Sequence, residues 1–384
     1  MQPVPYFPAV TVFLMLMTGL TAPALCSGSP SSSVQCGAVE ASTPASTVGN
    51  LPYPLRDAAA VCTGSEIYIF GGFTYGKVLD TIMVYKPGTV VGGVNPLDIR
   101  LPQPVMFPVS FWDGEKAYII GGINESMEPL PYLTIFTPPD KIELRENFFP
   151  YGLKGVGIAW TGKYAYIFGN CVGSSKNGSW NIIKFDPNAM AYSILPVVLP
   201  YGNSGLQAVW TGSDIYLFGG QKKSINSTRI GLSDRILRFD PDTLALTEMN
   251  AKLPSPVYKM SAVYQDKKVF VFGGFMPKNN ISDAIIVYDT IRDKITVPAN
   301  KLSRETAVRT SVLMQGNAYL FGGETAVGLS STIEMISLSG CLLENKSHRD
   351  DHIPATIVIL STVLVMTAIT LTSFLCLKKQ HPHR

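Results

Sequence analysis

A six-residue pattern of β-branched and aromatic residues that ends in a glycine pair occurs six times in this 384-residue chain. The copies are Ile67–Gly72, Ala117–Gly122, Ala165–Asn170, Ile215–Gly220, Val269–Gly274 and Ala318–Gly323, and their first glycines are spaced by 50, 48, 50, 54 and 49 residues. A period of this length indicates repeated supersecondary units that bury their apolar faces against one another. The repeats therefore constrain the whole fold.

Each copy predicts a strand that ends in a forced bend. β-branched and aromatic residues suit a strand that is buried on both faces, and the two glycines allow a backbone conformation that a Cβ would resist. Nine residues before the first glycine stand Cys62, Trp112, Trp160, Trp210, Tyr264 and Leu313. A turn such as Thr63-Gly64-Ser65 follows, so each repeat begins with a strand, a tight turn and a second strand. We expect these large side chains to pack between repeats, not to form a ligand cage.

A second aromatic residue follows each of the first five glycine pairs. These residues are Tyr85, Phe136, Phe185, Phe239 and Tyr288, and Asp comes directly after three of them. With this feature the chain resembles kelch-repeat β-propellers over about residues 33–340. The resemblance implies an all-β, six-bladed kelch-type β-propeller whose repeats occupy residues 50–340. The chain departs from the family pattern in lacking its usual Trp after this aromatic residue and in having Asn170 in place of a glycine.

The N-terminal residues read as a leader. Residues 1–26 contain the uncharged apolar run Val10–Leu20 followed by small residues, which predicts a signal peptide; an uncleaved anchor is the alternative. Residues 27–49 are predicted to be an exposed segment in which residues 33–40 form one strand. The sixth repeat supplies only three strands, at 310–314, 318–321 and 332–338. Because an open sheet edge is a template for aggregation, we expect the N-terminal strand to complete the last blade.

The C-terminal residues predict a membrane anchor. A stalk at 341–352 precedes the uncharged segment 353–377, which is long enough for one transmembrane α-helix. The basic tail 378–384 then places this end in the cytoplasm. We therefore expect a single-pass type I protein of the plasma membrane with an extracellular propeller. A glycolipid-anchor signal is the alternative.

In the oxidising extracellular compartment that this topology predicts, cysteines can form disulfide bonds and sequons can carry glycans. Ring closure would bring Cys36 and Cys341 together, so we predict a disulfide bond between them; Cys62 and Cys171 are either bonded or two separate thiols. Glycosylation sequons occur at Asn124, Asn177, Asn226, Asn280 and Asn345. The first four lie between a glycine pair and the next strand, in blades two to five. Blades one and six are adjacent in a ring, and this sector is left without glycans.

Charge and histidine content exclude several classes of function. The four histidines are at 348, 352, 381 and 383, outside the propeller, so we expect no metal site, no cofactor and no activity like that of the copper oxidases related to galactose oxidase. The three basic residues of the tail account for the formal net charge of +3. The rest of the chain is formally neutral, which argues against a nucleic-acid partner.

Recognition is the function that this organisation favours. A rigid propeller on a single span, with a seven-residue tail, predicts a cell-surface recognition, adhesion or co-receptor protein that binds an extracellular protein or glycan, with a possible partner in the same membrane. The candidate ligand-binding residues are Phe73, Tyr75, Lys77, Glu324, Arg56 and Arg304. No catalytic residue is assigned. The alternative is a carbohydrate-acting enzyme like the kelch propellers that interconvert sialic acid anomers, with charged groups such as Lys154 around a central pocket.

Overall fold

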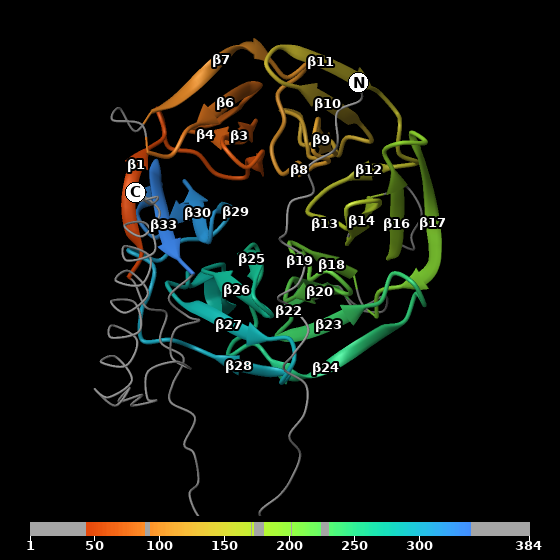
Figure 1. Ribbon diagram of the computed structural model, residues 1–384, viewed down its shortest axis with the longest axis vertical. Helices are drawn as coiled ribbons and strands as arrows, with labels where there is room; N and C mark the ends of the chain where they lie inside the picture. The colour runs from red at the N-terminus through yellow and green to blue at the C-terminus, as the bar shows by residue number, and fades with distance from the viewer. Residues whose placement is uncertain are drawn as a thin grey trace, which may run out of the picture. The chain divides into compact units, whose positions relative to one another are not determined.

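The computed structural model describes residues 44–88, 93–169, 171–172, 180–200, 202–223 and 230–338. Within these residues, six four-stranded antiparallel sheets are arranged in a ring (Figure 1). We number the sheets as blades 1 to 6 in the chain order of their innermost strands. The six-bladed propeller predicted from the repeats is confirmed.

The first half of the ring consists of three blades whose strands follow one another from the innermost to the outermost. Blade 1 contains β2 (Ala59–Cys62), β3 (Ile67–Phe70), β6 (Thr81–Tyr85) and β7 (Val94–Arg100). Blade 2 contains β8 (Val109–Trp112), β9 (Ala117–Ile120), β10 (Leu133–Thr137) and β11 (Lys141–Arg145). Blade 3 contains β13 (Gly157–Trp160), β14 (Ala165–Phe168), β16 (Asn181–Asp186) and β17 (Ala191–Val198).

The second half of the ring repeats this order. Blade 4 contains β19 (Gln207–Trp210), β20 (Ile215–Phe218), β23 (Arg235–Phe239) and β24 (Leu246–Lys252). Blade 5 contains β25 (Ser261–Gln265), β26 (Lys268–Phe272), β27 (Ile285–Asp289) and β28 (Lys294–Thr296). Blade 6 contains β29 (Thr310–Met314), β30 (Asn317–Phe321), β33 (Thr332–Ser337) and β1 (Ser46–Asn50).

The outermost strand of blade 6 comes from the N-terminal part of the chain. Strand β1 pairs antiparallel with β33, with Ser46 opposite Met335 and Asn50 opposite Thr332, and the two strands lie side by side in Figure 1. The closing strand thus lies at 46–50. The segment 33–40, in which we expected a strand, is outside the described residues.

The glycine pairs bring neighbouring blades into backbone contact. Gly322 has a φ of +58°, and a Cβ on it would lie 2.1 Å from the carbonyl oxygen of Leu55. The next residue, Gly323, donates its N–H to that same oxygen at 2.7 Å. Gly71 likewise has a φ of +61° and would place a Cβ 2.4 Å from the oxygen of Val105. Positive φ and a close neighbouring backbone together explain the requirement for glycine.

The recurring aromatic residues pack between blades, as the repeats predicted. Phe136 of blade 2 is fully buried, and its ring centroid lies 5.3 Å from that of Tyr68 in blade 1. Trp160 of blade 3 stacks on Phe111 of blade 2 with a centroid distance of 4.6 Å. Such contacts bury large apolar areas and fix the geometry of one blade on the next.

Several predicted features lie outside the described residues. These are the signal peptide, the stalk, the transmembrane segment, the tail, the Cys36–Cys341 bond and the sequons at Asn177, Asn226 and Asn345. The part of the chain that the structure describes contains no helix with the length and apolar character of a membrane span.

Candidate functional site

One end of the propeller carries two sets of connections, and we call this end the loop face. In an antiparallel blade, the connection from the second to the third strand lies at the same end as the connection that leads to the next blade. In blade 1 the first of these connections forms the hairpin β4 (Phe73–Thr74) and β5 (Lys77–Val78). In blade 6 it forms the hairpin β31 (Glu324–Thr325) and β32 (Gly328–Leu329).

The connections that lead into the innermost strands meet around the propeller axis, where backbone hydrogen bonds join most of them to their neighbours. Each contributes one residue with a φ between +52° and +67°; these residues, which we call the axial ring, are Asp57, Phe107, Gly155, Gly205, Lys259 and Val308. Five hydrogen bonds of 2.7–3.2 Å join the N–H of one member to the carbonyl oxygen of its neighbour. Because all six blades take part, the axial ring encircles the propeller axis at the loop face.

The side chain of Lys259 crosses the axial ring. Its Cγ lies 3.1 Å from the position that a Cβ on Gly205 would occupy. Its ammonium group lies 4.1 Å from the ring centroid of Phe107, a cation–π contact, and 3.9 Å from Oδ1 of Asp57. Blades 5 and 2 stand opposite each other in a ring of six, so Lys259 spans the axis. Burial lowers the pKa of its ammonium group, while Asp57 opposes this effect.

Asp57 is a buried carboxylate with two cationic neighbours. Its Oδ2 accepts a hydrogen bond from Nη1 of Arg56 at 2.7 Å, and Lys259 approaches its Oδ1. Burial nevertheless raises the pKa of Asp57 from 3.8 to about 6, because the loss of hydration outweighs the attraction of Lys259 and Arg56, and Glu324 adds repulsion. A carboxyl group with a pKa near 6 can both take up and release a proton near neutral pH.

Arg56 links blades 1 and 6. Its backbone exchanges hydrogen bonds of 3.1 and 2.8 Å with Phe73, and its guanidinium carbon lies 4.7 Å above the Phe73 ring. Its Nη1 also lies 3.4 Å from Oε2 of Glu324. Arg56, Phe73 and Glu324 therefore form a single charged and aromatic cluster beside the axial ring.

An aromatic pair lies in the same region of blade 5. The rings of Tyr258 and Phe275 stack with their centroids 5.4 Å apart, and their backbones exchange hydrogen bonds of 3.0 and 2.9 Å. Burial, together with the Glu324 carboxylate, raises the pKa of Tyr258. The hydroxyl of Tyr258 therefore stays protonated at neutral pH and is available as a hydrogen-bond donor or acceptor.

The structure brings together half of the predicted binding residues. Arg56, Phe73 and Glu324 are in mutual contact through Arg56. Tyr75 lies at the tip of the β4–β5 hairpin, beside Lys77, and both side chains are exposed. Arg304 is exposed in the connection that enters blade 6, where its carbonyl oxygen accepts a hydrogen bond from Thr306. These three residues are not joined to the cluster by any contact that the structure shows.

Four residues of the site were missed in the sequence: Asp57, Phe107, Lys259 and Tyr258. The first three could have been found from their spacing in the sequence. Every member of the axial ring stands 14 residues before the first glycine of its repeat. When the repeats are aligned on that glycine, two of the six positions hold a charged residue, Asp57 and Lys259. Such an alignment does not predict that these two side chains approach each other across the axis.

The described side chains include those of two predicted glycosylation sites and of one cysteine, Cys62. Asn280 is exposed and follows the short helix η1 (Pro277–Asn279) of blade 5. Asn124 of blade 2 donates a side-chain hydrogen bond to Glu128 at 3.0 Å. Both lie in connections from the second to the third strand, on the loop face.

The thiol of Cys62 is free and half-buried. Among the described residues, no three His, Cys, Asp or Glu side chains gather as a metal ion would require.

Comparisons with known proteins identify the repeats. Residues 155–339 match the KLHDC2/KLHL20/DRC7 Kelch-repeats domain, and residues 54–89 match the Kelch motif. A kelch domain-containing protein of Archaeoglobus fulgidus is 27% identical over 62% of this chain and 68% of its own length. A similar protein of Pyrococcus furiosus is 26% identical over 51% of this chain and 58% of its own length.

The solved structures that resemble this chain include that of YjhT. The structure of YjhT superposes with a TM-score of 0.62 at 17% sequence identity, and the match covers 75% of this chain and 96% of that one. At this identity the likeness concerns the fold alone.

Proposed function

Because this chain carries kelch repeats that form a six-bladed propeller, we propose that it is a cell-surface recognition protein whose loop face binds an extracellular protein or glycan. The observation that carries the proposal is the cluster of Arg56, Phe73 and Glu324, which joins blades 1 and 6 beside the axial ring. Partly exposed arginine next to an aromatic ring is typical of binding surfaces.

Three exposed apolar side chains around the cluster support a protein as the ligand. Val327, Tyr75 and Met127 are 94%, 76% and 55% exposed. Each lies in the connection from the second to the third strand, in blades 6, 1 and 2, which are consecutive around the ring. Valine and methionine side chains offer nothing to the hydroxyl groups of a glycan, whereas apolar groups at this exposure gain from burial in a protein interface.

The test uses particles that display the full chain and a panel of cell types. We expect saturable binding to some cells, before and after enzymatic removal of N-glycans from the displayed chain. Changing Tyr75 and Val327 together to serine should weaken this binding about tenfold or more, since exposed anchors of an interface often contribute more than 1 kcal/mol each. The matched control is Ile291→Ser, since Ile291 is 71% exposed at the opposite end of blade 5. Equal loss with both variants, or no binding by folded protein to any cell, would contradict the proposal.

A second candidate function rests on Asp57. A carboxyl group with a pKa of about 6 beside Arg56 and Lys259 suits general acid–base catalysis on a carbohydrate, in which one group transfers a proton while cations hold the substrate. The test is the rate at which sugar anomers interconvert, followed by proton NMR with the full chain and with Asp57→Asn. A rate above the uncatalysed one that disappears in Asp57→Asn would favour this enzyme function.

A further inference from the structure

The outermost strand of blade 3 exposes a row of apolar side chains. This strand, β17, lies on the outer rim of the ring (Figure 1). Its residues Tyr192, Ile194 and Val198 stand opposite every second residue of β16, from Phe185 to Asn181. Residues that are paired in an antiparallel sheet point to the same face, so the three side chains lie on one face of the blade. They are 36%, 43% and 55% exposed, and we call them the rim stripe.

The rim stripe continues the apolar core between blades 2 and 3 outward. The β16 residues opposite Tyr192 and Ile194 are fully buried in that core. One strand further out, the ring of Tyr192 packs on Phe148 and Phe149, with centroid distances of 5.9 and 5.7 Å. These contacts cover Tyr192 only in part, and Ile194 and Val198 are more exposed still. The apolar surface therefore extends beyond the core and reaches the solvent.

Blades 1 and 4 have charged residues where blade 3 has the rim stripe. In all three blades the two outermost strands shift register at the same place, so their residues correspond one to one around it. The counterparts of Val198 are Arg100 in blade 1 and Lys252 in blade 4, and the counterpart of Ile194 in blade 4 is Glu248. All three charged residues are exposed, and Arg100 and Glu248 form surface ion pairs. The apolar residues of β17 thus depart from the pattern of these rims.

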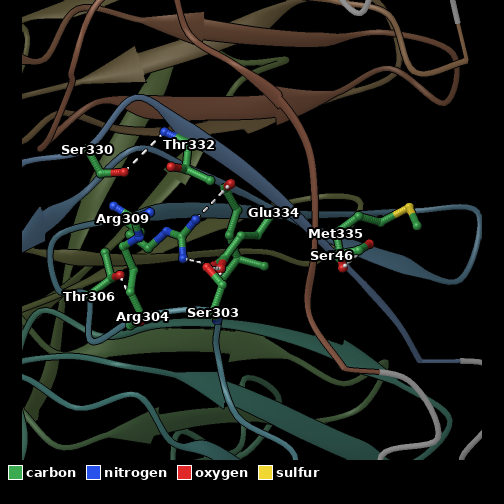
Figure 2. A network of polar contacts seen from close by, with 10 residues as sticks. Ser46, Ser303, Arg304, Thr306, Arg309, Ser330, Thr332, Glu334 and Met335 are labelled. Carbon is green, nitrogen blue, oxygen red and sulfur yellow. Dashed lines mark hydrogen bonds and ion pairs between the residues drawn. The ribbon is translucent and has the colours of Figure 1, made fainter.

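The other outer strands are charged, short or polar. Strand β11 carries three charged residues, and β28 has three residues in all. Blade 6 ends in β1, whose Ser46 hydroxyl donates to the carbonyl oxygen of Met335 at 3.3 Å; Figure 2 shows this contact on the strand that also carries Glu334, the buried partner of Arg309. Charges and short strands protect sheet edges from contact with other chains. Among the described outer strands, only β17 has exposed large apolar side chains.

The absence of charge favours a second copy of this chain as the partner. No charged residue occurs between Asp186 and Asp214. In a two-fold contact a patch meets its own copy, so a charge within the patch would face a like charge. A different protein is selected through charges complementary to its own, and the rim stripe offers none. Two copies, in contrast, gain from the mutual burial of their apolar side chains.

We propose that the rim stripe is the surface through which two copies of this chain associate around a two-fold axis. The contact is made by side chains, because Pro196 has no N–H and the register shift between Ile194 and Val198 interrupts the hydrogen bonding of the strand. Three side chains form a smaller contact than the about 1,200 Å² of a standard interface, so we expect a dissociation constant of about 1–100 µM. This surface is separate from the loop face and does not depend on the function proposed for it.

Sedimentation equilibrium of the full chain in detergent, at concentrations across about 1–100 µM, measures the association. We expect the mass to rise from that of a monomer to that of a dimer. The double variant Ile194→Lys, Val198→Lys should raise the dissociation constant at least about tenfold, because like charges then face each other. Blade 4 holds charged residues at both positions, so the fold accommodates the change. The matched control is Ile291→Lys, Val297→Lys, which adds the same charge at two exposed apolar residues of blade 5 and should leave the dissociation constant within about twofold.

Val198→Lys alone provides a second variant, with an expected rise of at least about threefold. The proposal is overturned if the full chain stays monomeric over the whole concentration range. It is also overturned if the double variant, with the circular dichroism spectrum of the wild type, dimerises as well as the wild type, since another part of the chain would then hold the dimer. Equal weakening by the control would show a general effect of charge and would likewise contradict it. Failure of the cell-binding experiment would leave all of these results unchanged.

Discussion

Gly323 donates its backbone N–H to the carbonyl oxygen of Leu55 at 2.7 Å, and this hydrogen bond joins the last blade of the propeller to the first. The same oxygen lies 2.1 Å from where a Cβ on Gly322 would stand. The glycine pair that defines the repeat is thus also the device that closes the ring. Its replacement should affect the stability of the whole domain.

Gly322→Ala should lower the free energy of unfolding by about 3–5 kcal/mol, because alanine must adopt a φ of +58° and displace the Leu55 carbonyl. Gly328→Ala is the control, since Gly328 has a φ of +129° and no atom lies within 4 Å of the position that a Cβ on it would occupy, so only backbone strain of about 1–3 kcal/mol remains. Urea unfolding followed by tryptophan fluorescence measures both. Equal losses would show that the contact with Leu55 is unimportant.

The buried ion pair of blade 6 provides a second test. Arg309→Met should destabilise the protein by about 3–5 kcal/mol, since Glu334 is left as an uncompensated buried charge. Aligned on the first glycine, Met260 of blade 5 stands in the position of Arg309, and Met83 of blade 1 stands in that of Glu334. The double variant Arg309→Met, Glu334→Met should therefore recover most of the loss. A double-mutant cycle from thermal unfolding checks this, and additive losses in the double variant would count against it.

Asp57 should make the stability depend on pH. Its pKa is about 6 in the folded protein and 3.8 when exposed, so the folded state holds this proton more tightly than the unfolded state does. The contribution of Asp57 to stability is therefore largest below about pH 4, falls by about 3 kcal/mol as the pH rises from 4 to 6, and is constant above that range.

The difference in urea midpoint between the wild type and Asp57→Asn isolates this contribution from those of other carboxyl groups. The variant should become relatively more stable as the pH rises through the window from 4 to 6. A difference that does not change with pH between 4 and 7.5 would refute the prediction.

Lys259 should hold the Asp57 pKa down from a still higher value. Lys259→Met removes a cation 3.9 Å from Oδ1, so the pKa of Asp57 should rise above 6. Carboxyl carbon NMR of protein labelled at aspartate measures the titration directly. The control is Lys301→Met, which removes a lysine paired with Asp283 at 2.8 Å on the surface. If both variants left Asp57 unchanged, the contact across the axis would have no electrostatic role.

The repeats predicted the fold because several independent sequence features recur together in them. Each copy combines a buried strand with a bend at a glycine, and the first five copies are followed by an aromatic residue, which packs on the neighbouring blade as Phe136 does on Tyr68. The closing strand was harder to place. Its sequence Ser-Thr-Val-Gly-Asn has one strongly β-forming apolar residue, and its pairing with β33 includes a bulge between Thr47 and Gly49. Such a strand depends on its partner more than on its own composition.

Two of the three residues in the cluster could be placed from the repeat signals. Phe73 and Glu324 follow glycine pairs directly, so their place on one face could be inferred. Asp57 and Lys259 lie in connections where an isolated charge is usually solvated. Their burial arises because the six connections converge on the axis, which brings residues 202 positions apart into contact. No local sequence pattern predicts a contact between residues so far apart in the chain.

The pairing of β1 with β33 has a consequence for the time course of synthesis. Ser46 Oγ donates to the carbonyl oxygen of Met335, a residue 289 positions later in the chain. A ribosome that adds about 5–20 residues per second makes those residues in roughly 15–60 s. Throughout that interval the segment Ser46–Asn50 has no strand to join. Blade 6 can therefore be completed only after β33 has been synthesised, although β1 is the first strand of the described part of the chain.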